Sequence, residues 1–288
     1  MQNKKKLYRT ISIVSLLVML IALVALIFIF AHIYASGQQY QDLSRLVRMN
    51  SRTVELSPES EPAQPDAGSS APVGTPLPEP ETEKPEPVYA SIPIDFTYLD
   101  EVNSDITAWI QVDGTGIDYP VLYDDTKDQF YLNHNYSKSF TMAGSVFMLG
   151  VNSSDFSDFN TVIYGHNLIN GAMFGCLHDF EQQAFFDEHD TILVYLSDRV
   201  LRYQIFAAYR TDNKNQVLSF DFSTPEARQE YIDRIFTHEV RALFRPDAAP
   251  TAEDRILTLS TCIGNPAYRY LVQGKLIEDT PGRYDPEE

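Results

Sequence analysis

Residues 258–272 read TLSTCIGNPAYRYLV. Two runs rich in β-branched and aromatic residues, TLSTC and YRYLV, flank a short segment that contains Gly264 and Pro266. Such runs on either side of turn-forming residues predict two strands joined by a hairpin-like loop. Cys262 ends the first strand and Arg269 begins the second, so this loop would bring their side chains face to face. The pair is the first candidate for chemistry in the chain.

Five stretches upstream of this hairpin also have the composition of strands. They are IQVDGTGIDYPVLY (110–123), which holds two strands around a glycine turn, GSVFML (144–149), NTVIYGH (160–166), TILVYL (191–196) and LRYQIFAAY (201–209). With RILTLSTC (255–262) and YRYLVQGKLI (268–277), the chain has about eight short strands with helices between them. This pattern predicts a mostly β fold, either a closed β-barrel or a curled mixed sheet.

Apolar residues at helical spacing predict the helices between these strands. Phe96, Leu99, Val102, Ile106 and Trp109 predict a helix over residues 95–109, with a break near Asn103 and Ser104. Further helices are expected at 125–132, at the apolar stripe Met173, Phe174, Leu177 and Phe180, and at 223–240, where Ser223 can cap the helix and Pro225 suits its first turn.

The N-terminal region contains a long apolar segment. Residues 11–33 hold no Asp, Glu, Lys or Arg, and 23 helical residues span roughly 35 Å, enough to cross a bilayer core of about 30 Å. Lys4, Lys5, Lys6 and Arg9 precede the segment, and the next Lys or Arg is Arg45. This asymmetry predicts a cytoplasmic N-terminus, with the rest of the chain outside. A signal peptide cleaved near Ala35 is the alternative, but its apolar region is usually only about 7–15 residues long.

The composition then divides the chain into five parts. Residues 1–10 form the cytoplasmic N-terminus, 11–33 the transmembrane helix, and 34–50 a short helical stub with Leu43, Leu46 and Val47 at helical spacing. Residues 51–88 contain nine prolines and eight acidic residues, a composition that predicts an extended spacer without a core. Residues 89–288 form the globular domain.

Charge and cysteine content exclude several functions. A net charge of −18 argues against nucleic-acid binding, which needs a basic face. The acidic balance fits a cationic or amine-bearing partner, although solubility is its simpler explanation. The two cysteines lie 86 residues apart without a CxxC motif, and the histidines show no paired ligand spacing, so no zinc site and no cofactor is expected. The sequence alone does not decide whether Cys176 and Cys262 form a disulfide.

Three residue types at predicted strand ends could form a catalytic set. A thiol becomes a nucleophile when a cation or a base assists it, and Arg269 and His166 are the candidates for these roles beside Cys262. Each residue also has a plainer interpretation, as a packed thiol, a structural imidazole or a surface cation. Cys176 is expected to pack in a helix, and His134, His178, His189 and His238 are interpreted as loop or solvated residues. Asp124, Asp125 and Asp128 could bind calcium, but helix capping is their more probable use.

In combination, these motifs resemble the sortases, and their class B branch in particular. The resemblance covers residues 96–277 and rests on NSDITAWI, GTGIDYPV, FYLNH, GSVFM, NTVIYGHNLINGAMF and RILTLSTC followed by an arginine. It implies a closed sortase β-barrel of about eight strands, class B helices at its N-terminus and a helix before the TLSTC strand. The anchor and spacer also match the family's usual arrangement on Gram-positive cell surfaces.

The resemblance implies a cysteine transpeptidase that cleaves a C-terminal sorting motif of exported proteins. Cys262 would form a thioester with the motif, His166 would serve as general acid and base, and Arg269 would stabilise the oxyanion. The acyl group would pass to an amine of a peptidoglycan precursor or to a pilin lysine. Ser260, Thr261, Leu132 and Leu218 resemble substrate-binding residues by position. Two departures stand out: Leu149 replaces an acidic residue that the family usually has, and the segment IGNPAY is short.

Two other functions remain possible on the sequence alone. In cysteine peptidases of the papain or NlpC type the cysteine precedes the histidine, whereas here His166 precedes Cys262 by 96 residues, which disfavours them. A surface binding module that has kept the fold without catalysis is disfavoured by the presence of all three candidate residues.

Overall fold

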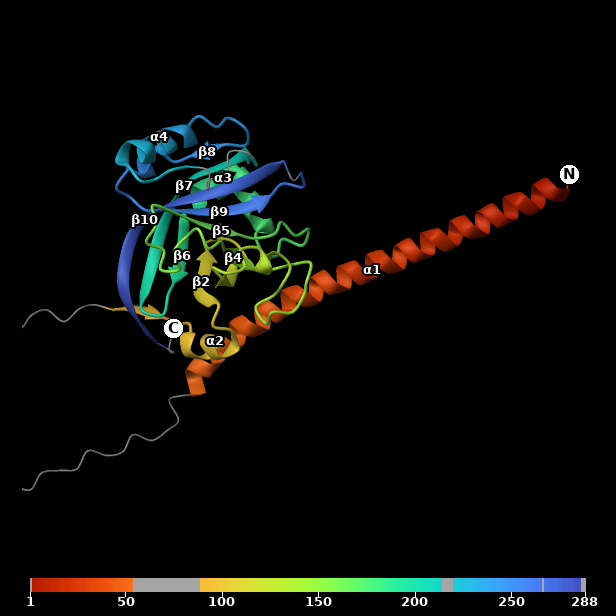
Figure 1. The fold of residues 1–288 in the computed structure, drawn as a ribbon, viewed down its shortest axis with the longest axis horizontal. Helices are drawn as coiled ribbons and strands as arrows, with labels where there is room; N and C mark the ends of the chain where they lie inside the picture. The colour runs from red at the N-terminus through yellow and green to blue at the C-terminus, as the bar shows by residue number, and fades with distance from the viewer. Residues whose placement is uncertain (1, 54–88, 214–219, 266, 286–288) are drawn as a thin grey trace, which may run out of the picture.

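A computed structural model describes residues 2–53, 89–213, 220–265 and 267–285. Eight strands form a closed barrel in the order β10-β9-β5-β4-β3-β2-β6-β7, and β7 pairs with β10 to close it (Figure 1). The barrel strands are β2 (Ile106–Val112), β3 (Asp118–Tyr123), β4 (Val146–Met148), β5 (Asn160–Tyr164), β6 (Thr191–Tyr195), β7 (Arg199–Asp212), β9 (Ile256–Cys262) and β10 (Tyr268–Tyr284). The predicted barrel of about eight strands is therefore confirmed.

Two further strands lengthen the sheet outside the closed barrel. The strand β1 (Ala90–Ile92) pairs in parallel with the end of β10, and β8 (Leu243–Phe244) pairs antiparallel with β7. Inside the barrel, side chains that alternate along the strands form one apolar core. Members of this core from four different strands are Ile110, Val146, Leu259 and Val272.

The β9–β10 hairpin has the arrangement that the sequence predicts. Seven cross-strand pairs run from Cys262 opposite Arg269 to Ile256 opposite Lys275. Gly264 adopts φ +79° in the connecting loop, a conformation that glycine reaches without strain. Because β5 pairs in parallel with β9, with Tyr164 opposite Ser260, both strands end at the same edge of the barrel. This pairing places the segment after β5 beside the hairpin loop.

The predicted helix over residues 95–109 is wrong in its second half. The helix α2 spans only Phe96–Val102, capped by Asp95, whose side chain accepts from Tyr98 N. Asn103 ends it in an extended conformation and donates to Tyr131 Oη and to the Tyr136 carbonyl. Ile106 and Trp109 then belong to β2, which is buried on both faces at its centre and partly exposed at Thr107 and Gln111.

The remaining helices are shorter than expected. Residues 125–132 contain only the 3₁₀ helix η2 (Phe130–Leu132), and the stripe from Met173 to Phe180 precedes and enters the 3₁₀ helix η3 (Gly175–Glu181). The helix α4 spans Pro225–Ile235, with Thr224 rather than Ser223 as its cap. Two more short helices are α3 (Gln183–Glu188) and η5 (Pro246–Ala248).

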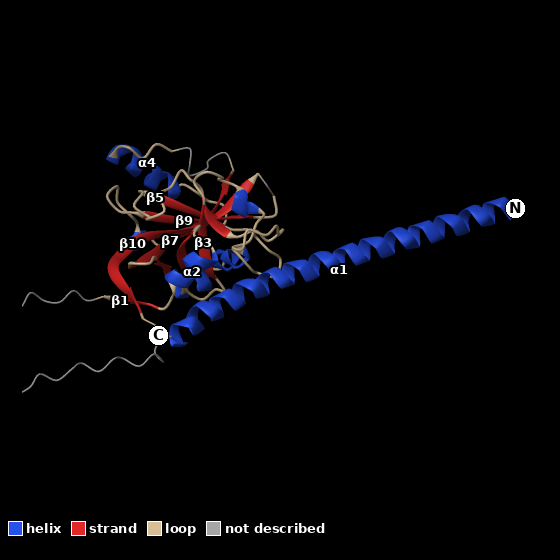
Figure 2. Cartoon of the chain, turned by 60° about the horizontal axis from the view of Figure 1, so that its bottom comes forward, coloured by secondary structure: helices blue, strands red, loops and turns tan. Residues whose placement is uncertain are grey.

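The helix α1 (Gln2–Thr53) is a single continuous rod whose C-terminal third lies along the barrel (Figures 1 and 2). Tyr40, Leu43 and Val47 are buried there, whereas Leu46 faces solvent, so the expected stub is the docked end of α1. Residues 8–31 are exposed, and α1 is long and apolar enough to cross a membrane. Most of the predicted spacer, residues 54–88, lies outside the described residues.

Asp118 on β3 is the polar centre of this docking. Its carboxylate accepts from Ser44 Oγ at 2.7 Å and from Arg48 Nη2 at 3.0 Å, both on α1. From the barrel, Trp109 Nε1 donates to it at 2.7 Å and Gln111 Nε2 at 2.9 Å. Partial burial alone would raise the pKa of Asp118, but these donors outweigh it and hold the pKa below its ordinary value.

Candidate active site

Cys262 and Arg269 stand directly opposite each other at the open end of the β9–β10 hairpin. Both side chains are half-buried, and the Cys262 thiol is free. Cross-strand neighbours lie about 5 Å apart at Cβ, which places the guanidinium within reach of a group bound at the sulfur. The facing pair predicted from the sequence is therefore present.

His166 reaches the same edge of the barrel from β5. It follows Tyr164 by two residues, and its Nε2 lies 2.7 Å from the Leu132 carbonyl oxygen. Because a carbonyl only accepts, this contact fixes the neutral ring with its hydrogen on Nε2. The side chain of His166 is half-buried. The structure thus brings His166, Cys262 and Arg269 to one edge, as the sequence predicts.

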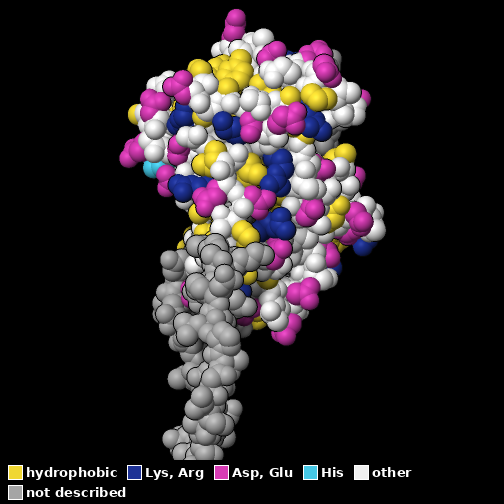
Figure 3. Space-filling model, turned by 90° about the vertical axis from the view of Figure 1, so that its left-hand side faces the viewer, with side chains coloured by type: hydrophobic (Ala, Val, Ile, Leu, Met, Phe, Trp, Pro, Cys, Tyr) yellow, Lys and Arg dark blue, Asp and Glu magenta, His cyan; other side chains and the backbone are white. Residues whose placement is uncertain are grey.

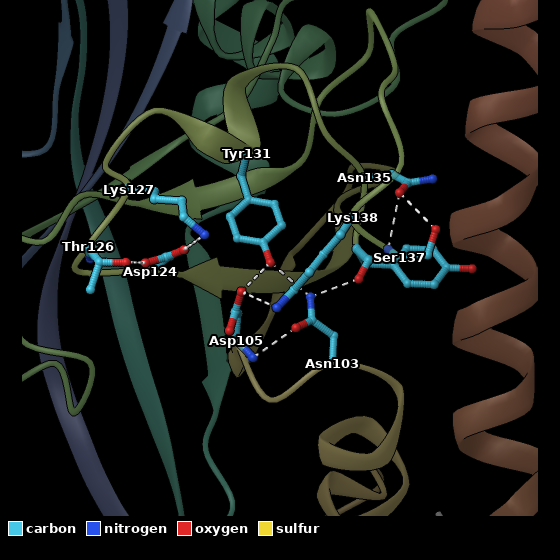
Figure 4. A network of polar contacts seen from close by, with 10 residues as sticks. Asn103, Asp105, Asp124, Thr126, Lys127, Tyr131, Asn135, Ser137 and Lys138 are labelled. Carbon is cyan, nitrogen blue, oxygen red and sulfur yellow. Dashed lines mark hydrogen bonds and ion pairs between the residues drawn. The ribbon is translucent and has the colours of Figure 1, made fainter.

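The loop that carries Leu132 is held by a polar network (Figure 4). Tyr131 is buried, and its hydroxyl donates to Asp105 Oδ2 at 2.5 Å while accepting from Asn103 Nδ2 at 2.9 Å. Lys138 Nζ lies 2.9 Å from the same Asp105 carboxylate. Because Tyr131 is fixed, the next residue presents its carbonyl to His166 from a rigid support.

A second network lies behind Cys262 and was missed in the sequence. The Cys262 carbonyl accepts from Asn167 Nδ2 at 2.9 Å and lies 3.0 Å from His178 Nε2. His178 Nδ1 donates to Glu181 Oε1 at 2.7 Å, and Arg241 Nη1 binds the same carboxylate at 2.8 Å. These contacts fix the backbone that carries the thiol.

The interpretation of His178 as a solvated residue is therefore wrong. Its side chain is only 23% exposed, and its ring stacks on Tyr270 with 5.1 Å between centroids. The segment is a 3₁₀ helix, in which residues three apart lie on the same side, so His178 meets Glu181 directly. The i, i+3 pair of His and Glu is the signal that the sequence offered.

A groove of about 370 Å³ runs over the outer surface of the barrel beside Cys262. Its lining comes from β4, β5, β9 and β10, from the loop at Gln129 and Leu132, and from the end of β7; members of the lining are Phe147, Val162, Tyr164, Ser260, Leu271, Arg269, Asp212 and Asn213. Ser260 precedes Cys262 by two residues and so shares its face of β9. Leu149, where the family usually has an acid, adds apolar surface.

The four residues expected to bind substrate have different positions. Leu132 and Ser260 line the groove. Thr261 does not, because its side chain is buried on the opposite face of β9, where its hydroxyl donates to the Gly165 carbonyl at 2.9 Å. Leu218 lies outside the described residues.

The electrostatics of the groove centre on Tyr164 and Arg269. Burial raises the pKa of the Tyr164 hydroxyl, and the nearby Arg269 cation partly opposes this effect. Tyr164 is therefore a neutral phenol near pH 7, and Arg269 brings a positive charge into a groove whose walls are partly apolar. A cation in such surroundings interacts strongly with any negative charge that develops beside it.

Cys176 is chemically unlike Cys262. It is a half-buried free thiol packed against the barrel core, as predicted, and desolvation raises its pKa. A raised pKa leaves less thiolate and hence a poorer nucleophile. No Cys176–Cys262 disulfide is formed.

The other histidines and the acidic loop have structural contacts. His134 stacks on Phe130 and His238 on Tyr209, while His189 Nδ1 lies 3.0 Å from Asp113, so the interpretation of His189 and His238 as solvated is wrong. Asp124 accepts from Thr126, and Asp128 accepts from Gly150 N. No group of His, Cys, Asp and Glu suited to a metal ion occurs within the described part of the chain.

Comparison with known proteins agrees with this fold and site. A family model described as the sortase domain matches residues 110–277. Sortase B of Staphylococcus aureus is 33% identical over 167 residues, which cover 58% of this chain and 67% of that protein. Sortase B of Listeria monocytogenes is 32% identical over 182 residues, covering 62% and 72%.

Solved structures give the same result. The X-ray structure of Clostridium perfringens sortase B superposes with a TM-score of 0.59 at 31% identity, covering 64% of this chain and all of that one. A Staphylococcus aureus sortase B–substrate complex gives 0.58 at 32% identity, covering 64% and 84%. These matches exclude a papain-type peptidase, and they favour an enzyme over a non-catalytic binding module. The chain belongs to the sortase family, in its class B branch, and is a cysteine transpeptidase that sorts surface proteins.

Proposed function

We propose that Cys262, His166 and Arg269 are the catalytic residues of this transpeptidase. The observation that carries the proposal is the cross-strand pairing of Cys262 with Arg269 at the edge where His166 also lies, beside an open groove. Among the described residues, Cys176 is the other thiol, and it is packed against the core. The three proposed residues supply a nucleophile, a proton carrier and a fixed cation.

The reaction has two acyl-transfer steps. In the first, His166 takes the proton of the Cys262 thiol, the sulfur attacks the carbonyl carbon of the scissile peptide, and the carbon–nitrogen bond breaks as His166 passes that proton to the leaving amine. The product is a thioester on Cys262. In the second, an incoming amine attacks the thioester and His166 takes its proton. The carbon–sulfur bond then breaks, and His166 returns the proton to the Cys262 sulfur. In both steps Arg269 stabilises the negative charge on the tetrahedral oxygen.

The groove is the proposed site for the sorting motif. Its apolar walls, including Leu132 and Leu149, would bury apolar side chains of an extended peptide, and Ser260 offers a hydroxyl near the scissile bond. A Staphylococcus aureus sortase B has been solved as a substrate complex, which supports substrate binding in this fold. Leu218 would add to the groove wall by resemblance, and Thr261 would act only by supporting β9.

The N-terminal region is the proposed membrane anchor. Residues 11–33 would cross the membrane once with the N-terminus in the cytoplasm, and the domain 89–288 would lie on the outer surface of a Gram-positive cell. Residues 51–88 would form an extended spacer segment. The acceptor would be an amine of a peptidoglycan precursor or of a pilin lysine, and an acidic domain suits such cationic partners.

The test of the catalytic residues is transpeptidation in solution. Wild-type protein incubated with a sorting-motif peptide and a small amine should give a thioester visible by intact mass and a peptide–amine product. Cys262→Ala should abolish both because it removes the nucleophile. Cys176→Ala is the matched control and should leave both intact, since that thiol is packed against the core. Normal turnover by Cys262→Ala would overturn the assignment.

A further inference from the structure

We propose that the barrel edge that carries Cys262 faces the membrane, and that the loop around Phe140 and Met142 lies in the lipid headgroup layer. This inference rests on the proposed anchoring of α1. It goes beyond anchoring, because a tethered domain could present any of its faces to the lipid. The evidence comes from how α1 is docked, which apolar side chains are exposed near it, and where the acidic residues are.

The docked part of α1 sets the height of the barrel above the membrane. The helix is continuous from the apolar segment into the barrel, and the Ser36 and Thr141 hydroxyls are 2.9 Å apart. Ser36 is three residues beyond Ile33, the end of the apolar segment, which is a rise of about 4.5 Å. The headgroup layer on each side of a bilayer is roughly 5–7 Å thick. Thr141 therefore lies at the level of the headgroups.

The residues on either side of Thr141 are apolar and exposed. The Phe140 side chain is 66% exposed and Met142 is 50% exposed. In the loop that follows His166, Ile169 is 90% exposed. Tyr34, on α1 itself, is 67% exposed and has the amphipathic character of residues found at membrane interfaces. Transfer of such side chains from water into a membrane interface is favourable, and Phe140 and Met142 lie on either side of Thr141, which contacts the membrane end of α1.

Three loops at the same edge lack carboxylates, and the nearest strand-end acid is Asp212, which lines the groove. The chain has 40 Asp and Glu residues, only nine of which precede residue 89, yet the loops 133–145, 164–173 and 263–268 contain none. By contrast, the face turned away from the N-terminus of α1 carries many acidic and basic side chains (Figure 3). Carboxylates lose hydration when they approach lipid, so loops without them suit contact with a membrane.

The direction of the hairpin agrees with this orientation. In Figure 1 the arrow of β9 points toward the side on which the N-terminus of α1 lies. Tyr40 Oη donates to the Gly144 carbonyl at 3.0 Å, and Gly144 packs against the His166 ring. Tyr40 is seven residues beyond Ile33, a rise of about 10 Å. The catalytic edge would thus lie close enough to the bilayer to reach peptides and acceptors that are themselves tethered there.

The test measures lipid contact at chosen positions of the full-length protein in vesicles. With Cys176→Ser and Cys262→Ala as background, single cysteines replace Phe140, Ile169 or Ile277 and carry an environment-sensitive fluorophore. The vesicles contain lipid with a nitroxide in the headgroup region. Ile277 is the control, because it is 50% exposed like Met142 but lies eight residues along β10 from Arg269, about 26 Å away.

We expect blue-shifted emission and loss of fluorescence for the labels at 140 and 169, and neither effect at 277. Two results in protein that floats with the vesicles would overturn the inference: equal quenching at the three positions, or no quenching at 140 and 169. In either case the proposed anchoring by α1 would still stand. Failure to float would instead overturn the anchoring proposal, and the inference with it. The use of two loop positions guards against one labelled variant that does not fold. The catalytic assignment is unaffected in each case, because the thioester assay does not need vesicles.

Discussion

His166 and His178 both belong to the surroundings of Cys262, but they have contrasting contacts: His166 follows the strand that pairs with β9, whereas His178 contacts the Cys262 carbonyl. His166 makes one hydrogen bond, from Nε2 to the Leu132 carbonyl, and its Nδ1 has no hydrogen bond to any residue that the structure describes. His178 has partners at both ring nitrogens and a stacked ring on its face. A ring with fixed partners at both nitrogens has no site at which to exchange a proton with substrate. Proximity to a thiol therefore does not by itself identify the proton carrier, and the available nitrogen of His166 is the reason for proposing it in that role.

Substitution of His166 is the most direct test of this contrast between the two histidines. If His166 is the general acid and base, His166→Ala should lower turnover about 10²–10⁴-fold, the usual contribution of a positioned proton carrier. The pH dependence of turnover should change as well. Single-turnover kinetics with a sorting-motif peptide would measure both effects. Near-normal turnover would mean that the proton comes from another group.

Substitution of His178 should have a smaller effect of a different kind. His178→Phe keeps an aromatic ring on Tyr270 but removes the polar contacts of the imidazole with Asn167, with the Cys262 carbonyl and with Glu181. A misplaced nucleophile can slow a reaction up to about a hundredfold, so we expect about a tenfold loss. The shape of the pH profile should stay that of the wild type, since no proton carrier is lost. If His178→Phe changed the pH profile of turnover while His166→Ala left it unchanged, His178 rather than His166 would be the proton carrier.

The buried hydrogen-bond network around Gln273 lies farther from the thiol. Its loss should therefore affect the stability of the fold rather than turnover. Gln273 is fully buried; its Nε2 donates to Tyr231 Oη and Thr258 Oγ1, and its Oε1 accepts from Tyr209 Oη. Gln273→Met has a similar volume but leaves these groups with fewer partners, which should lower the free energy of unfolding by about 1–3 kcal/mol. Urea unfolding would measure the change. Turnover well below the unfolding range should stay normal, and a large loss there would show that this network also positions Cys262.

The smallest expected effect concerns pH and the docking of α1. Because the folded-state pKa of Asp118 is lowered, its contribution to stability is present above the unfolded pKa of 3.8 and is lost as pH falls through the folded value. Trp109, the only tryptophan, donates to Asp118 and reports on this contact. Its fluorescence should change below about pH 4. Asp118→Asn should remove that transition, and an unchanged transition in this variant would assign it to another carboxyl group.

Sequence patterns predicted the strands well because each has the alternation or the apolar content of a half-buried or buried strand. They also placed Cys262 opposite Arg269, since both are local to one hairpin. The proximity of His166 depends on the parallel pairing of β5 with β9, which joins segments 96 residues apart, and no local pattern gives that pairing. The sequence placed His166 only at a strand end.

The errors have local physical causes. Ile106 and Trp109 fit both a helix and a strand, and the decision came from Asn103, whose side chain bonds to Tyr131 and Tyr136 and ends α2. His178 was misjudged because its burial depends on Tyr270, far along the chain. The docking of α1 depends on Asp118, and a lone aspartate in a strand gives no sign of the helix that will bind it.

The register of the β9–β10 hairpin has a consequence for how such an enzyme can diversify. Seven cross-strand pairs lock Cys262 opposite Arg269, and a slip of one residue would turn the arginine toward the barrel interior. The loop 263–267 lies beyond this ladder, so residues can be exchanged, added or lost there without moving the pair. Under the proposed mechanism, descendants can therefore vary this loop, including the length of the IGNPAY segment, while they inherit the bond-making chemistry unchanged.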